Sequence, residues 1–467
     1  MMKDEPAGGA GFDVVVIGAG PAAVAALDAL DSGQNIAVIT GAVPSSEKRR
    51  SLHPKIQALS ISLAEAAGVS ERIDATTNSS RPLFSTAAVG GLANYWGQQF
   101  VRWQDEDPWP RDAFTGFDDY LHACARIERL FSLEGGEPLD SGLAGHGFAS
   151  TKPRLLSGSA AHAGTGFGAM RLAFEAAAQN VSARVISARA RSFARERNRW
   201  TIALDDGSRI TAARVLLAAG VIGDGQLLLR SFPDLQGLQF ADHAPWMLYT
   251  IGLKRHLPPR PGGYRREFNA LTVEKTSTSG CSLFASIYDI RGAELNLVLA
   301  SAIGRSHSWL RHWPSPPGTG FITPVQVWTP KTYGRVDVAG NDGKLSFQPD
   351  ITEAGFDPDL AEFLSRISSL GGKVLRKRRT IPAFGYHYHR LRLRPRGSRW
   401  VDVGEFLLDR TGSGVTCIDA AELTHIGCRP HTLTVMARAS VKARGGAELA
   451  APISPQVTDL LRVVRTV

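Results

Sequence analysis

The sequence predicts an α/β fold: a Rossmann-like nucleotide-binding domain with an inserted, mainly antiparallel β-sheet domain. Three observations predict it. A buried strand, a glycine turn and a helix open the chain within residues 12–30. Short β-rich segments with turns between them fill residues 246–347. A strand and a helix return at residues 415–443, so the first domain is assembled from separated pieces of chain.

The opening segment carries the first motif. Phe12–Ile17 and Asn35–Thr40 are apolar runs typical of buried parallel strands, and residues 22–30 between them indicate a helix rich in small residues. Residues 18–23 read GAGPAA, a G-x-G-x-x-A turn placed directly between strand and helix. In that position the pattern predicts a dinucleotide site, because the helix N-terminus favours a pyrophosphate.

Each small residue of this turn has a distinct purpose. Gly18 allows the chain to turn, Gly20 leaves room for a pyrophosphate at the backbone, and Ala23, with Ala22 beside it, lets helix and strand pack closely. Thr40 stands where an acidic residue usually binds the ribose hydroxyls. We therefore expect Thr40 or the later Glu47 to take part in ribose binding, or the ribose to be held more weakly.

A second glycine motif, VGGLANYWG, spans residues 89–97. Paired glycines followed by a polar residue and two aromatic residues suit a backbone pressed against a flat ring. An ordinary glycine turn with buried aromatic side chains is the alternative. The candidate residues are Gly90, Gly91, Asn94, Tyr95 and Trp96.

Strands are also expected around 184–193 and 200–220, and Pro358–Leu370 is expected to form a helix with Asp357 as its N-cap. The expected middle strands are Trp246–Leu253, Phe268–Val273, Cys281–Tyr288, Leu295–Ala302, Pro324–Trp328, Val336–Val338 and Leu345–Phe347. Val415–Ile418 and Thr432–Ala443 are the expected final strand and helix.

Three of the 12 histidines, His387, His389 and His431, flank the final strand-to-helix unit and suggest a shared site. Their spacing supplies no third ligand for a metal, so we expect no metal site. The four cysteines are scattered and form no CxxC pair, which excludes a disulfide framework and a cysteine zinc site.

Five ordered segments resemble the glucose–methanol–choline (GMC) oxidoreductases, in a short form similar to pyranose 2-oxidase. They are residues 18–23, Ser85–Gly97, Val215–Ser231, Gln239–Pro245 and Asp419–Ala439. The resemblance implies FAD and an architecture shared with p-hydroxybenzoate hydroxylase. It assigns 11–100, 155–240 and 405–467 to a discontinuous FAD-binding domain, 101–154 to a connecting segment or lid, and 241–404 to a substrate-binding domain. It adds cofactor-binding candidates at Ala190, Ala219, Gly220, Asp419 and Thr432.

The resemblance also implies oxidation of an alcohol, from a sugar or a natural product, to a carbonyl by histidine-assisted hydride transfer to flavin N5. Residues 388–391 (YHRL) best match the family setting of the proton acceptor, His389. His387 would share its face of a strand, so either could be the base. His431 is placed in the second catalytic position, although Arg429 occupies the literal Asn position of the family pattern. Tyr95 replaces the histidine that links FAD covalently in pyranose oxidase-like loops, so non-covalent FAD is expected.

Other functions stay open: an FAD enzyme of another class such as a monooxygenase, or a catalytically inactive flavin-binding protein. A NAD-dependent dehydrogenase is disfavoured, because the acidic residue after the second strand is absent. The formal net charge of +9 comes without a recognised nucleic-acid-binding module, so nucleic acid is not an expected partner.

Residues 1–11 carry Asp4 and Glu5 and no apolar run, so we expect no signal peptide, and no uncharged stretch approaches the length of a membrane span. The richness in arginine and alanine leads us to expect a bacterial, cytoplasmic protein. Eight arginines crowd the histidine region, at 376, 378, 379, 390, 392, 394, 396 and 399. They indicate either a solvated basic surface or an anionic alcohol substrate.

Overall fold

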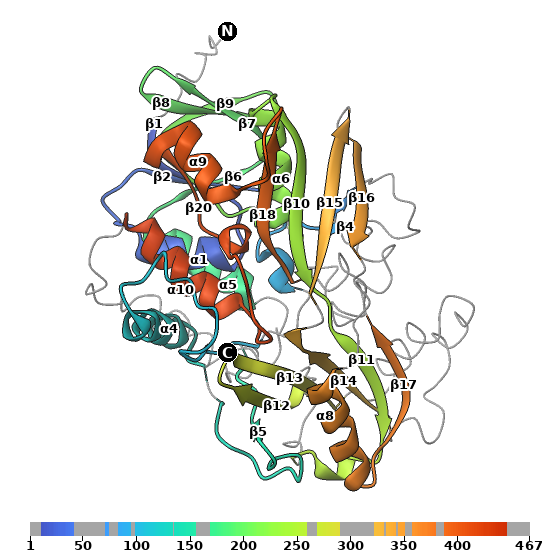
Figure 1. Cartoon of the computed structure of the whole chain (residues 1–467). Coiled ribbons are helices and arrows are strands. Elements are labelled where there is room, and N and C mark those ends of the chain that lie inside the picture. The colour runs from blue at the N-terminus through green and yellow to red at the C-terminus, as the bar shows by residue number, and fades with distance from the viewer. Residues whose placement is uncertain are drawn as a thin grey trace, which may run out of the picture.

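The computed structural model describes residues 11–41, 71–73, 83–94, 99–133, 135–155, 169–258, 269–289, 322–330, 333–341, 344–350, 357–379 and 387–445. These residues form two lobes (Figure 1). The upper lobe in that view contains a seven-stranded sheet and a five-stranded sheet, and the lower lobe is built on a six-stranded sheet.

The seven-stranded sheet has the order β6-β2-β1-β9-β8-β7, with β20 also paired to β9. Its centre is β1 (Gly11–Ile17), parallel to both β2 (Ile36–Thr40) and β9 (Arg209–Leu217). The other strands are β6 (Arg184–Ser187), β7 (Ala190–Glu196), β8 (Arg199–Leu204) and β20 (Val415–Cys417). The predicted opening of strand, helix and strand is confirmed.

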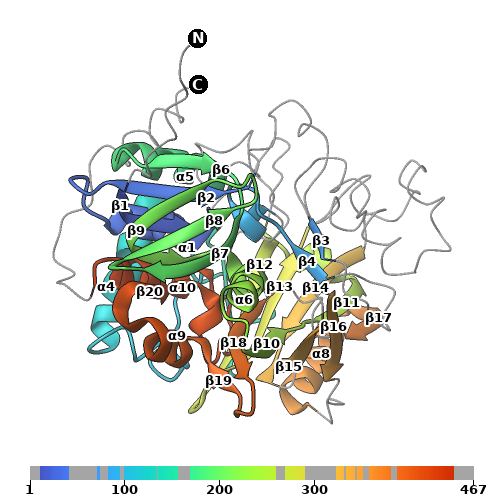
Figure 2. The same ribbon diagram turned by 90° about the horizontal axis from the view of Figure 1, so that it is seen from above.

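One face of this sheet is covered by helices, which lie together in Figures 1 and 2. They are α1 (Pro21–Ala29), α5 (Ala169–Asn180) and α10 (Thr432–Ala443), with α4 (Phe117–Phe131) against α10. Leu27, Phe174 and Met436 meet in the buried core beneath them. The alanines of α1 permit the close approach of α1 to α10. The bounds of α10 match the predicted final helix.

The opposite face packs on a second core that includes α6 (Gly220–Ser231), α9 (Val403–Thr411) and the five-stranded sheet. Figure 2 shows α6 between the two sheets. The five-stranded sheet has the order β16-β15-β10-β18-β19. Its strands are β10 (Leu235–His243), β15 (Tyr333–Asn341), β16 (Lys344–Asp350), β18 (Tyr388–Pro395) and β19 (Val401–Asp402).

The six-stranded sheet of the lower lobe has the order β17-β11-β14-β13-β12-β5, and α8 (Pro358–Ser369) packs on one of its faces. Asp357 caps α8 by accepting a hydrogen bond from the Leu360 amide, as predicted. The strands are β5 (Phe148–Thr151), β11 (Trp246–Ile251), β12 (Asn269–Ser277), β13 (Gly280–Tyr288), β14 (Ile322–Trp328) and β17 (Lys373–Arg379).

The region expected to form one inserted sheet therefore forms two sheets. One of them contains β10, β15 and β18, which lie beside the first domain and pack into its second core. The expected border at 240/241 falls inside β10, and residues 101–154 supply α4 to one lobe and β5 to the other. The strand expected at Leu295–Ala302 lies outside the described residues.

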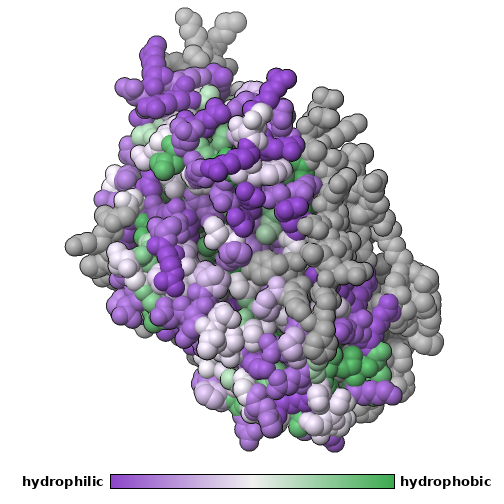
Figure 3. Space-filling model, in the orientation of Figure 1, coloured by the Kyte–Doolittle hydropathy of each residue, from purple (hydrophilic) through white to green (hydrophobic). Residues whose placement is uncertain are grey.

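A short two-stranded sheet pairs β3 (Glu71–Ile73) with β4 (Leu83–Ser85). Among the described helices, none combines the length and apolar character needed to cross a membrane. The face of the molecule drawn in Figure 3 is mainly hydrophilic over both lobes.

Candidate functional site

The turn after β1 is shaped by two glycines with different constraints. Gly18 has φ +114°, and a Cβ there would lie 2.2 Å from the carbonyl oxygen of Ala218, so no other residue fits. Gly20 is the N-cap of α1 and provides no side-chain cap, and the first turn of α1 has no acidic residue. The N-terminal amides of α1 can therefore bind an anionic group, as a pyrophosphate site requires.

The second glycine motif lies directly on this turn. The Gly90 amide donates to the Ala19 carbonyl oxygen at 2.8 Å. A Cβ on Gly91, which has φ +57°, would lie 3.2 Å from Gly20 Cα. The 3₁₀ helix η2 (Gly91–Asn94) follows, while Tyr95 and Trp96 lie outside the described residues. Two glycine segments about 70 residues apart thus form one backbone cradle.

The end of β2 lies beside the same cradle. Buried Thr40 donates its hydroxyl to the Ala87 carbonyl oxygen at 3.3 Å and accepts the Ala188 amide on its own carbonyl at 3.0 Å. Ala190 begins β7 two residues later. Ala22 and Ala23 are buried in α1 and serve helix packing. Thr40, one of the two residues proposed from sequence for the ribose, thus lies near the cofactor-binding candidate Ala190, while the other, Glu47, lies outside the described residues.

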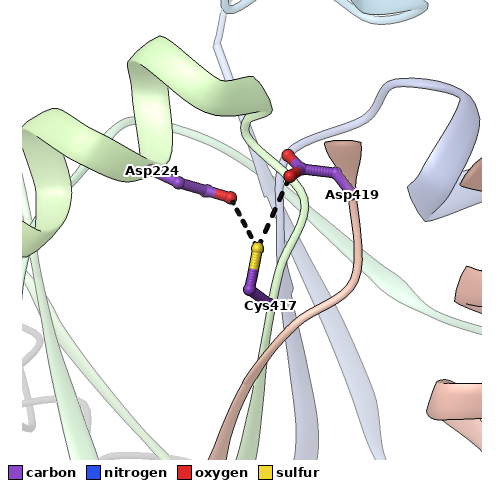
Figure 4. Close-up of side chains that lie close together, drawn as sticks. All are labelled: Asp224, Cys417 and Asp419. Carbon is purple, nitrogen blue, oxygen red and sulfur yellow. Dashed lines mark hydrogen bonds between the residues drawn. The ribbon is translucent and has the colours of Figure 1, made fainter. Parts of the chain in front are cut away.

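Asp419 joins the carboxyl end of β20 to the start of α6. Its two oxygens accept the amides of Gly220 at 2.6 Å and Ala421 at 2.9 Å. Asp224 of α6 accepts the Ala219 amide at 3.1 Å, and the Cys417 thiol lies 3.5 Å from an oxygen of each carboxyl group (Figure 4).

Burial raises the pKa of Asp224 well above its usual range, and the adjacent Asp419 carboxylate adds to this shift. Burial also raises the pKa values of Asp419 and of the Cys417 thiol. The three potential ligand atoms lie within 4.8 Å of one another. Metal binding needs deprotonated ligands, however, and these surroundings favour a protonated Asp224 and a neutral thiol. The cluster therefore joins α6 to the loop after β20 through hydrogen bonds.

The three histidines proposed from sequence gather at one place. His389 is fully buried on β18, and its Nδ1 lies 3.0 Å from the His387 carbonyl oxygen. The His387 ring stacks on Trp328, with ring centroids 5.3 Å apart and planes 9° apart. It meets the His431 ring edge to face at 5.6 Å. His431 is the N-cap of α10, and Thr432 is the first residue of that helix.

The hydrogen bond of His389 fixes its tautomer. A carbonyl oxygen can only accept, so Nδ1 carries the proton and Nε2 keeps the lone pair. Burial lowers the pKa of His389 well below its ordinary value, and His431, His243 and His425 lower it further. Burial also lowers the pKa of His431 to about 4. Both rings are therefore neutral near pH 7.

His243 belongs to the same cluster, although no role was predicted for it from the sequence. This fully buried residue ends β10, and its Nε2 lies 3.1 Å from the Thr329 carbonyl oxygen. Burial lowers its pKa to about 3, and His431 adds to the effect. Trp328, which holds His387, was also missed. The DHAP sequence at 242–245 was a signal for His243, but its proximity to His431 arises from tertiary packing.

Arg429 points elsewhere. It is buried in ion pairs with Asp107 and with Glu274, the latter at 3.0 Å. The neighbouring Pro430 carbonyl oxygen accepts the Trp103 indole N–H at 3.2 Å. Arg429 thus anchors the loop before α10 to the six-stranded sheet and to residues 103–107. Of the two candidates for the second catalytic position, His431 is the one that contacts His387.

No protein-family model and no curated protein matches the chain. Its structure is similar to the crystal structure of pyridoxine 4-oxidase from Mesorbium loti, with a TM-score of 0.52 and 14% sequence identity. The match covers 93% of this chain and 99% of the oxidase. The similarity over nearly the whole length of both chains shows that this protein has a GMC-like α/β fold.

Proposed function

We propose that the protein is an FAD-dependent oxidoreductase that oxidises an alcohol to a carbonyl. The observation that carries this proposal is the meeting of His387, His389 and His431 in a chain that also holds a glycine cradle for a pyrophosphate. The GMC-like fold supports it.

The residues of the cradle suit FAD. Gly18, Gly20 and the uncapped N-terminus of α1 would hold the pyrophosphate, while Gly90 and Gly91 would lie against the cofactor. Thr40 and Ala190 would lie at the adenosine end. Asn94, Tyr95, Trp96, Ala219, Gly220, Asp419 and Thr432 complete the proposed set. We expect the FAD to be non-covalent, because Tyr95 cannot form the histidine linkage.

The histidines would carry the proton chemistry. The lone pair on His389 Nε2 accepts the proton of the substrate hydroxyl, and the Nδ1 hydrogen bond keeps the ring in the required orientation. His431 would donate a hydrogen bond to the developing alkoxide. His387, held by Trp328, would position the substrate beside both rings. When bound, FAD supplies the hydride acceptor.

The test is anaerobic flavin reduction by a panel of sugars and aromatic or aliphatic alcohols. The purified protein should be yellow and should release its FAD on denaturation. An alcohol that bleaches the flavin then serves as substrate in stopped-flow measurements. His389→Ala should slow reduction by roughly 10²- to 10⁴-fold at unchanged FAD content, the usual contribution of a general base.

His387→Ala is the matched control and should slow reduction less. If the effects are reversed, the two histidines exchange roles. A protein that takes up no FAD would contradict the proposal. Bound FAD that no alcohol reduces would favour the inactive flavin-binding alternative.

A further inference from the structure

The six-stranded sheet has two faces of different character. Val325 and Val327 of β14 point into the core beneath α8. The alternate residues Gln326 and Trp328 therefore lie on the other face, which we call the open face. Trp328 stacks there on His387. The open face is thus the side of the substrate sheet that meets the proposed catalytic histidines.

The region after the second glycine motif is attached to the same face. The Gln99 amide donates to the Thr272 hydroxyl at 2.6 Å and accepts from the Ser286 hydroxyl at 3.2 Å. The Tyr288 hydroxyl donates to the Gln326 carbonyl at 2.5 Å. Polar side chains on the open face therefore extend from Gln99 across β12 and β13 to Gln326 of β14.

At that edge the register places two arginines on the open face. Gln326 pairs with Met247 of β11, and Met247 pairs with Arg378 of β17. Two residues along, Tyr249 pairs with Arg376. Both arginines are exposed, and neither has an ion-pair partner among the described residues.

The Tyr249 hydroxyl is influenced by the charges of both guanidinium groups. Burial raises the pKa of its hydroxyl, while the positive charges of Arg378 and Arg376 act in the opposite direction. This phenol is buried, with 7% of its surface exposed. A hydroxyl and two cations that have no acidic partner in the described part of the chain thus share one end of the open face.

Other arginines of this region have partners. Arg390 and Arg392 pair with Asp402 at 3.3 and 3.5 Å, on the solvent side of the five-stranded sheet. Charged residues on an edge strand commonly prevent aggregation, and Lys377, on the α8 side of β17, fits that explanation. That explanation does not account for two arginines beside Tyr249 on the face that carries Trp328.

We propose that Arg376 and Arg378, with the Tyr249 hydroxyl, bind a carboxylate or phosphate group of the alcohol whose hydroxyl lies at the histidine cluster. This inference rests on the proposed function and names its substrate class. Arg378 lies two strand spacings, about 10 Å, across the sheet and two residues, about 7 Å, along it from Trp328, so the anionic group lies at the far end of the substrate from the reacting carbon. Arginine suits this role because its planar fork binds such oxygens in pairs.

The first experiment measures binding without turnover. Isothermal titration calorimetry of the FAD-loaded protein at about 0.15 M salt uses terephthalate for the carboxylate arm and phenyl phosphate for the phosphate arm. Arg376→Ala/Arg378→Ala should weaken the preferred anion by about tenfold or more, the effect of losing charged hydrogen bonds. Lys377→Ala/Arg396→Ala removes the same net charge and should change binding by less than about twofold, because distant charges are screened.

The second experiment compares anaerobic flavin reduction by 4-(hydroxymethyl)benzoate, by 4-(hydroxymethyl)phenyl phosphate and by the neutral 4-(hydroxymethyl)benzamide. We expect an anionic alcohol to saturate at lower concentration than the amide in the wild type but not in Arg376→Ala/Arg378→Ala. Equal half-saturating concentrations for all three alcohols would overturn the proposed anion site. Equal losses of anion affinity in both double variants would overturn it too. Either result would leave the proposed oxidoreductase function intact. Arginine-dependent anion binding without any flavin reduction would support the anion site and contradict the proposed function.

Discussion

Gly18 and Gly20 are two residues apart but are glycines for different reasons. Gly18 has a left-handed backbone and no room for a Cβ. Gly20 has φ −85°, which any residue adopts, and a Cβ there would meet only Gly91 Cα at 4.0 Å. The fold itself therefore requires Gly18, whereas the proposed cofactor site requires Gly20.

Gly20→Ala should consequently fold normally yet bind FAD weakly, and Gly20→Val should abolish binding, because the added carbons enter the path of the pyrophosphate. Gly18→Ala should instead destabilise the protein by about 1–3 kcal/mol or more through backbone strain. The flavin-to-protein absorbance ratio and the free energy of unfolding by urea separate these effects. Wild-type flavin content in Gly20→Val would show that this turn is not the cofactor site.

The adjacent carboxyl groups of Asp224 and Asp419 differ in their protonation. Asp224 holds the proton, because burial and the neighbouring carboxylate raise its pKa, so Asp224→Asn preserves its shape and charge. Both oxygens of Asp419 accept backbone amides, and an asparagine NH₂ would oppose one of them. We expect Asp419→Asn to cost about 1–3 kcal/mol in unfolding free energy and Asp224→Asn to cost less. Equal costs in urea unfolding would contradict this assignment of the proton.

The loop before α10 depends on a buried ion-pair network. Arg429 joins it to Asp107 and Glu274, and its side chain is 2% exposed. Arg429→Met should cost about 3–5 kcal/mol, because it leaves buried carboxylates without their cation. The control Arg399→Met removes an exposed arginine with a loose pair at 3.9 Å, and should change stability by no more than about 0.5 kcal/mol. Similar unfolding free energies for the two variants would contradict the anchoring role.

Elements with local signals were predictable from the sequence. The sequence predicted the start of α8 and both bounds of α10 correctly and the end of α8 to within one residue, since caps and periodicity act within a few residues. The separate pairing of β10 with β15 and β18 was not predicted, because these strand partners lie about 100 and about 150 residues apart in the sequence. His243 was missed for the same reason. In the sequence it is only a polar residue at the end of a strand, and its position beside His431 arises from tertiary packing.

At the scale of the molecule, the candidate site lies where the two lobes meet. The cradle belongs to the upper lobe, Trp328 to the lower one, and His431 to a loop anchored to both. Such a junction excludes water, which holds the histidines in their neutral forms.

This burial predicts acid sensitivity of the whole protein. His243, His389 and His431 have lowered pKa values in the folded state, so the unfolded chain binds their protons first as the pH falls below about 6.5. His425, which is exposed, has a lowered pKa and acts in the same direction, while the proton held by Asp224 acts in the opposite one. Unfolding should therefore take up about two protons near pH 5, and stability should fall by roughly 2–3 kcal/mol per pH unit.

The histidine cluster is the source of this slope, which a single substitution can test. His243→Asn removes one buried imidazole, so the slope of unfolding free energy between pH 6 and pH 5 should decrease by about 1.4 kcal/mol per pH unit, the value of one proton. The comparison uses the slope, which is insensitive to any constant loss of stability caused by the substitution. His122→Asn, on the exposed side of α4, should keep the wild-type slope. A slope unchanged in His243→Asn would mean that this imidazole is protonated in the folded protein, and the site would then carry positive charge where the proposed chemistry needs a neutral base.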